Sequence, residues 1–93
     1  MVIKSFNSKA LAKLFSEGDG RKVQPKHIAK LKLILSLLNA AENVRDMDAP
    51  GMRFHALGGK MKGIYSVWVD ENYRVMFRFK AGNAEDVDYG DYH

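Results

Sequence analysis

The chain has no cysteine, only two prolines among its 93 residues, and no apolar run long enough to cross a bilayer. The absence of cysteine excludes disulfides, thiolate metal sites and cysteine nucleophiles, and it fits a reducing compartment. Residues 1–6 lack the long apolar stretch of a signal peptide, so we expect a cytoplasmic protein without membrane attachment.

Several catalytic motifs are missing as well. The sequence has no HExxH metal motif, no phosphate-binding loop of the Walker type and no GxSxG serine elbow. Its three histidines are scattered, and no spacing typical of metal ligands stands out. We therefore expect neither a metal nor another cofactor.

The composition that remains is apolar enough for a core and is basic overall. Hydrophobic residues make up 46% of the chain, which suits one small domain over residues 1–93. The net charge is +4, and residues 1–65 carry 12 Lys and Arg against 5 Asp and Glu. A basic body favours polyanionic partners, but charge alone does not separate RNA, DNA, the ribosome or an acidic protein.

Residues 72–80 show the clearest alternation in the sequence and predict a strand. Its apolar face consists of Tyr73, Val75, Phe77 and Phe79. Its opposite face consists of Arg74, Met76, Arg78 and Lys80. Cations spaced two residues apart suit either a solvated outer face or a surface that meets phosphate.

The rest of the chain predicts two helices and four further strands. Leu11, Leu14 and Phe15 recur at helical spacing, which indicates a helix over residues 8–17 capped by Asn7 or Ser8. A wide apolar stripe after Pro25 indicates a helix over 25–42, followed by a loop over 43–51. The other predicted strands are 1–6, 53–57, 64–69 and 84–89, the last leading into a tail over 90–93.

This order of elements predicts a two-layer α+β domain. Short connections favour a mainly antiparallel meander, and the two helices should cover one face of the sheet. The other face would then stay open and carry Arg74, Arg78 and Lys80. If His55 points to the same side, a histidine joins these cations.

The candidate chemistry rests on histidines, cations and the acidic tail. A histidine gives and takes protons near neutral pH, so His55 and His93 are the acid–base candidates, whereas His27 suits a surface or helix-capping role. Asp91 can orient an imidazole, and Tyr92 can stack on a base or donate a proton. The tail is either a frayed chain end or part of an acidic segment, residues 82–93, which contains no Lys or Arg and docks against the Arg74 and Arg78 stripe. Cations, imidazole, tyrosine and carboxylate without a metal suit RNA cleavage through the 2′-OH.

Five segments of the chain together resemble HigB toxins, which belong to the RelE/ParE superfamily of bacterial type II toxin–antitoxin systems. The resemblance lies in residues 3–6, 53–57, 62–67, 72–79 and 88–93, and it extends over nearly the whole chain. The terminal Asp-Tyr-His and the Asn-x-Arg entry into the strand are its most specific parts.

The resemblance implies a RelE-like, microbial-RNase-like fold and an endoribonuclease that cuts messenger RNA in the ribosomal A site. It implies a HigA-type antitoxin with a helix-turn-helix domain, and operator DNA bound only through the toxin–antitoxin complex. The active-site positions carried over are His55, Arg74, Asp91, Tyr92 and His93. The RNA-binding positions carried over are Lys60, Lys62 and Arg78.

Two other functions stay open, one of them because of a departure from the family pattern. Gly58 stands where the family usually has a lysine, so either Lys60 or Lys62 substitutes for it or catalysis is weakened. One alternative is therefore a module that only binds RNA or an antitoxin. The superfamily also contains ParE-type inhibitors of DNA gyrase, so a non-enzymatic gyrase inhibitor is the other alternative.

Overall fold

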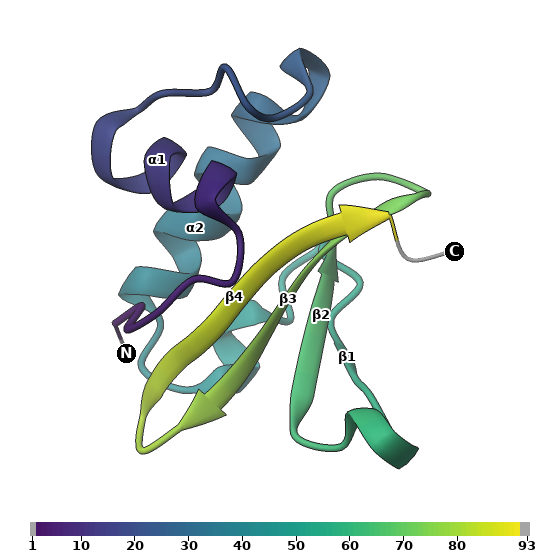
Figure 1. Ribbon diagram of the computed structural model, residues 1–93. Helices are drawn as coiled ribbons and strands as arrows, with labels where there is room; N and C mark the ends of the chain where they lie inside the picture. The colour runs from purple at the N-terminus through teal and green to yellow at the C-terminus, as the bar shows by residue number, and fades with distance from the viewer. Residues whose placement is uncertain (1, 92–93) are drawn as a thin grey trace.

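Two helices pack on one face of a four-stranded sheet in the computed structural model, which describes residues 2–91 (Figure 1). The helices are α1, Lys9–Glu17, and α2, Ile28–Ala40. The strands are β1, His55–Ala56; β2, Ile64–Trp68; β3, Tyr73–Lys80; and β4, Asn83–Asp91. The strands lie in the order β1-β2-β3-β4 and all pair antiparallel, which confirms the predicted α+β meander.

The two predicted helices are present with small changes at their ends. The Ser8 side chain accepts a hydrogen bond from the Leu11 N–H and caps α1, and Gly18 ends it in the left-handed region at φ 70°. The second helix starts with a 3-10 turn, η1, Pro25–His27, and its α-helical part ends at Ala40, two residues before the predicted end. Proline suits this start because its missing N–H has no helical partner there.

The core lies between the helices and the sheet. The helical side contributes Leu11, Leu14, Leu31, Ile34, Leu35 and Leu38, and the sheet side contributes Val67, Val75, Phe77 and Val87. In β3, Val75 and Phe77 are buried while Arg78 and Lys80 are exposed. The alternation read from residues 72–80 therefore assigns the two faces of this strand correctly.

The predicted first strand is reduced to two isolated bridges. Ile3 and Phe6 pair in parallel with Ala84 and Val87 of β4. Between these two bridges, Asp86 has φ 53° and the β3–β4 register shifts. A bulge of this kind interrupts the regular ladder, so residues 2–6 follow the edge of β4 without forming a continuous strand.

Two local predictions after α2 are wrong in detail. The segment expected to be a loop contains a 3-10 turn, η2, Val44–Met47, because Asn43 and Asp46 form a capping box around its start. The strand expected over 53–57 is ordered as a strand only at His55–Ala56. Arg53 has φ 48°, which is incompatible with extended backbone and delays the start of β1.

The last strand is longer than predicted. Gly90 pairs with Arg74 and Asp91 with Tyr73, so β4 continues through residues that were expected to form a tail. Tyr92 and His93 lie outside the described residues. Within residues 2–91, none of the helices has the length and apolar character needed to span a membrane.

Candidate functional site

The face of the sheet opposite the helices carries rows of side chains that include a histidine and an arginine. Directly opposed residues on neighbouring strands share a face, and His55 is opposite Ser66, which is opposite Met76. One row further along, Trp68 is opposite Arg74. The pairing thus places His55 and Arg74 in adjacent rows of the same face, as the sequence predicted.

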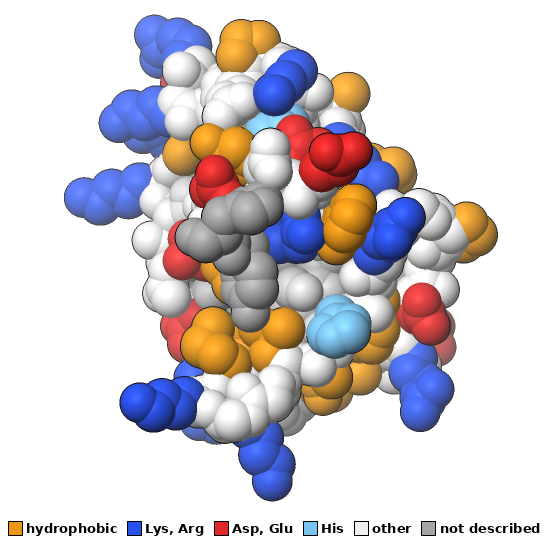
Figure 2. All heavy atoms as spheres, turned by 90° about the vertical axis from the view of Figure 1, so that its right-hand side faces the viewer, with side chains coloured by type: hydrophobic (Ala, Val, Ile, Leu, Met, Phe, Trp, Pro, Cys, Tyr) orange, Lys and Arg blue, Asp and Glu red, His pale blue; other side chains and the backbone are white. Residues whose placement is uncertain are grey.

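These rows form a hollow of about 440 Å³. Its lining consists of Arg53, Phe54, His55, Leu57, Ser66, Trp68 and Arg74. Figure 2 looks onto this side of the molecule and shows basic and hydrophobic side chains beside each other, with an exposed histidine near them. The hollow combines an imidazole that solvent can reach with two guanidiniums.

Arg74 is held by the turn between β2 and β3. Its Nη1 donates to the carbonyl oxygens of Asp70 at 2.7 Å, Glu71 at 3.0 Å and Tyr73 at 3.2 Å. Its guanidinium carbon also lies 4.2 Å from the centroid of the Trp68 ring. The side chain is therefore fixed by hydrogen bonds at one nitrogen and by stacking on the plane of the group.

Arg53 and Trp68 belong to this hollow, but the sequence analysis did not select them as site residues. The Arg53 guanidinium carbon lies 4.3 Å from the centroid of the Trp68 ring, so one indole binds two cations. Two signals were present in the sequence. Trp68 is the only tryptophan, and the alternation over 53–57 put Arg53 on the same side as His55.

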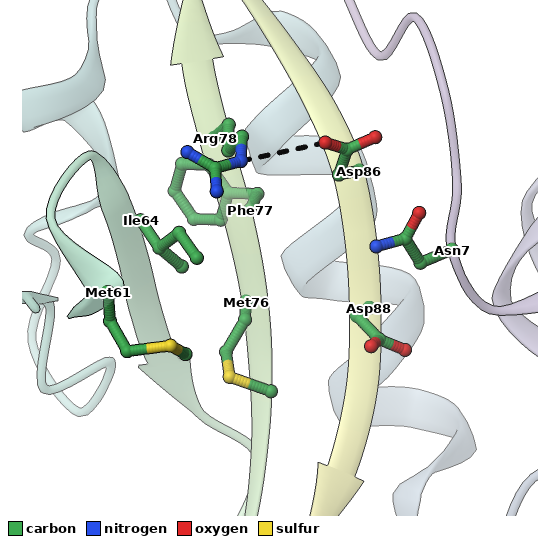
Figure 3. Close-up of a pocket in the computed structure, with 8 residues that line it drawn as sticks. All are labelled: Asn7, Met61, Ile64, Met76, Phe77, Arg78, Asp86 and Asp88. Carbon is green, nitrogen blue, oxygen red and sulfur yellow. Dashed lines mark ion pairs between the residues drawn. The ribbon is translucent and has the colours of Figure 1, made fainter.

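The other predicted RNA-binding residues lie outside this hollow. Lys60 and Lys62 are exposed in and after the 3-10 turn η3, Gly59–Met61. Arg78 lines a second hollow of about 280 Å³, where its Nε lies 3.6 Å from Oδ2 of Asp86 (Figure 3). An acidic residue of β4 thus pairs with one cation of the stripe, as the docking alternative for the acidic segment anticipated.

Asp91 is placed by the register of β4. It is opposite Tyr73, whereas Arg74 is opposite Gly90, so the strand position of Asp91 belongs to the face of Tyr73 and Val75 and not to the face that carries His55 and Arg74. Tyr92 and His93 are the two predicted site residues outside the described part of the chain. The structure therefore brings His55 and Arg74 together and leaves the roles of the last three residues as predictions.

His27 occupies the N-cap position of α2, but its side chain has neither the surface role nor the capping role that was expected. Only 2% of it is exposed, and it caps no helix through its side chain. Its Nε2 lies 2.6 Å from Oδ2 of Asp70, and its Nδ1 lies 2.6 Å from Oη of Tyr89. The hydrogen bond from His27 lowers the pKa of Asp70 well below the usual range, and burial raises the pKa of Tyr89.

The described residues offer no ready metal centre. Among residues 2–91, no three His, Asp or Glu side chains come together in a way that could hold a metal ion. What the hollow does offer is a proton carrier and fixed positive charge, a combination suited to a phosphodiester.

Comparison with known proteins gives one family. A family model described as "RelE-like toxin of type II toxin-antitoxin system HigB" matches residues 4–93. The chain is also 30% identical over 92 residues to Endoribonuclease HigB of Proteus vulgaris, an alignment that covers 99% of this chain and 100% of that protein. The matched region includes every helix and strand described above.

Proposed function

Since the chain belongs to the family of RelE-like toxins of the type II toxin–antitoxin system HigB, we propose that it is an endoribonuclease that cleaves messenger RNA on the ribosome. The similar protein from Proteus vulgaris is named an endoribonuclease, which favours RNA cleavage over inhibition of DNA gyrase. The observation that carries the proposal is the shared hollow of His55 and Arg74 on the open face of the sheet.

The reaction needs only groups that the chain can supply. A base removes the proton of the 2′-OH, and the resulting oxygen attacks the adjacent phosphorus. The bond from phosphorus to the 5′ oxygen breaks, an acid protonates that oxygen, and the products are a 2′,3′-cyclic phosphate and a free 5′-OH. Negative charge increases on the phosphoryl oxygens in the transition state, where a fixed guanidinium stabilises it.

We assign these steps to the residues selected from the sequence. His55 and His93 transfer the protons, and Arg74 stabilises the charge on phosphorus. Asp91 orients an imidazole, and Tyr92 stacks on a base or donates a proton. His55 and Arg74 occupy one hollow, which supports the first part of this assignment.

RNA binding extends beyond the reacting groups. Lys60 and Lys62 are exposed in the connection between β1 and β2, and Arg78 lies further along the open face of the sheet. We add Arg53 to these residues, because its guanidinium stacks on the same Trp68 ring as that of Arg74 and lines the same hollow. Cations spread along one face suit the successive phosphates of a single strand.

As a toxin of a type II toxin–antitoxin system, the protein has an antitoxin partner. We propose that this partner is a HigA-type protein with a helix-turn-helix domain, and that operator DNA binds only through the complex of the two. An mRNA substrate on ribosomes places the toxin in the cytoplasm. Ribosomal delivery suits a site on the open face of the sheet, because the ribosome would position the message and the toxin would complete the chemistry.

The test is cleavage of a translated message. The purified protein is added to a reconstituted translation reaction, and new 5′ ends of the mRNA are mapped by primer extension. We expect cleavage that depends on ribosomes, is lost in Arg74→Ala and is retained in Lys32→Ala, which removes an exposed cation from α2 on the helical side. Absence of cleavage by the wild-type protein, or equal cleavage by Arg74→Ala, would refute the proposal.

The same protein preparation separates the alternatives. Inhibition of gyrase supercoiling that persists in a variant lacking residues 91–93 would favour a non-enzymatic inhibitor. RNA binding without cleavage would favour a binding module in which Gly58 has weakened catalysis.

A further inference from the structure

The buried histidine lies outside the hollow, between the start of the helical layer and the end of the sheet. Both ring nitrogens of His27 are engaged, Nε2 with Asp70 and Nδ1 with the Tyr89 hydroxyl, at 2.6 Å each. Because the Asp70 carboxylate only accepts, Nε2 donates to it, and Nδ1 is left to bind the Tyr89 hydroxyl. The Tyr73 ring packs against the imidazole with centroids 4.9 Å apart.

Asp70 connects this histidine to the turn between β2 and β3. While its Oδ2 binds His27, its Oδ1 accepts from the backbone N–H groups of Asn72 at 2.9 Å and Tyr73 at 2.8 Å. One carboxylate thus closes the turn and ties it to the helical layer. A turn closed by an Asp side chain in this way has a well-defined backbone path.

The same turn holds Arg74. The Asp70 carbonyl accepts the shortest of the three hydrogen bonds from Arg74 Nη1, at 2.7 Å. Asp70 therefore binds His27 through its side chain and Arg74 through its main chain. A substitution at His27 would therefore act on the Arg74 guanidinium through one residue, Asp70.

Tyr89, His27 and Asp70 have the same order of hydroxyl, imidazole and carboxylate as a nucleophilic triad, but burial argues against catalysis here. His27 is 2% exposed, so a substrate has no direct access to its ring. Burial also raises the pKa of Tyr89, which keeps the phenol neutral and a poor nucleophile. Tyr89, His27 and Asp70 therefore do not form a catalytic triad, and their role is structural.

We propose that His27 and Asp70 are positioning residues for Arg74, which they hold in the geometry needed to stabilise the phosphoryl transition state. His27 fixes Asp70, Asp70 fixes the turn, and the turn carbonyls fix one end of the guanidinium while Trp68 fixes its plane. The role in cleavage rests on the proposed function; the restraint on Arg74 does not.

The restraint is tested by nitrogen-15 relaxation of the Arg74 guanidinium, a measurement that needs no activity. We expect an ordered group in the wild-type protein and a mobile one in Asp70→Asn and His27→Gln. The matched control is Asp19→Asn, which makes the same chemical change at another turn, where Asp19 accepts from the Arg21 backbone N–H and pairs with the Arg21 side chain. Arg74 should stay ordered in that control.

The catalytic consequence is tested by mRNA cleavage with the same variants. A misplaced catalytic group lowers the rate of the chemical step, so kcat should fall by up to about 100-fold while KM changes little. A merely structural role would lower the folded fraction, seen by circular dichroism, and would not change kcat per folded molecule.

Two results would overturn the positioning proposal. One is a freely rotating Arg74 guanidinium in the wild-type protein, which requires no variant to fold. The other is an ordered Arg74 and unchanged kcat in a folded Asp70→Asn variant. If Arg74 is ordered in a wild-type protein that does not cleave mRNA, the proposed function is wrong, but the proposal that Asp70 and the turn hold Arg74 is not affected.

Discussion

Trp68 and Arg74 are directly opposed across β2 and β3, and the guanidinium carbon of Arg74 lies 4.2 Å from the centroid of the indole. This contact keeps the Arg74 cation on the open face of the sheet. The turn between β2 and β3 holds the same guanidinium through a hydrogen bond from Nη1 to the Asp70 carbonyl oxygen. A flexible arginine would lose rotamer freedom each time it bound a phosphate, whereas this one has already lost it. Preorganised charge is what a phosphoryl transition state requires.

Replacing Arg74 with lysine should not preserve activity. A lysine keeps the charge but lacks the planar group that stacks on Trp68 while donating to the turn carbonyls. We expect Arg74→Ala to reduce cleavage by about 100- to 1,000-fold and Arg74→Lys to recover little of that loss. Single-turnover cleavage of mRNA on programmed ribosomes measures both. Near wild-type cleavage by the lysine variant would show that charge alone suffices.

Replacing Arg53 with glycine should separate stability from RNA binding. Arg53 has φ 48°, where glycine is unstrained, so the free energy of unfolding should stay within about 1 kcal/mol of the wild-type value. Loss of the phosphate contact should weaken RNA binding by about tenfold and reduce the salt slope of the affinity by about 0.7. Binding is measured with an RNA whose scissile 2′-OH is removed, which prevents cleavage.

Arg53→Lys provides the comparison for this prediction. It retains the charge, so its salt slope should match that of the wild type. If Arg53→Gly instead bound RNA normally and lost several kcal/mol of stability, Arg53 would be a structural residue.

Introducing a lysine at Gly58 should increase cleavage without disturbing the fold. Gly58 has φ −116°, and a Cβ there would meet no heavy atom within 4 Å, so the backbone accepts a side chain. The control is Gly59→Lys, which adds the same charge one residue later at φ 60° and should cost roughly 1 kcal/mol of stability. The prediction is tested by measuring the cleavage rate and the urea midpoint of both variants. An unchanged rate in Gly58→Lys would mean that Lys60 or Lys62 already does the work of the family lysine.

Acid should destabilise the protein partly through Asp70. The hydrogen bond from His27 lowers the pKa of Asp70 in the folded chain, so the carboxylate stabilises the fold at pH values above its ordinary pKa of about 3.9. That contribution is lost as the pH falls below this value toward the folded-state pKa. We expect Asp70→Asn to have a lower urea midpoint than the wild type at about pH 6 and the difference to narrow below about pH 3.

Asp48→Asn is the control for the acid series, because it removes an exposed carboxylate from the loop after η2. Its urea midpoint should differ little from the wild type across the same pH range. A difference between Asp70→Asn and wild type that stays constant with pH would show that the charge of Asp70 does not contribute.

Local sequence patterns predicted two residues of the site that lie on strands, His55 and Arg74. The alternation over residues 72–80 assigned Arg74 to the open face, and the short pattern around His55 put it on the same side as Arg53. Neither pattern revealed the left-handed backbone of Arg53, the 3-10 turn at Val44–Met47 or the extension of β4 to Asp91. Those features depend on caps, bulges and pairing, which a period of two or 3.6 does not encode.

The sequence by itself determined the two helices, the faces of the long strand, the basic body and the family to which the chain belongs. Only the tertiary structure decided what His27 does. Its two partners lie 43 and 62 residues away, and no local pattern links positions so far apart. The helical layer must pack on the sheet before that imidazole, the Asp70 carboxylate and the turn that holds Arg74 come together, because side-chain contacts across layers follow from packing rather than from spacing along the chain.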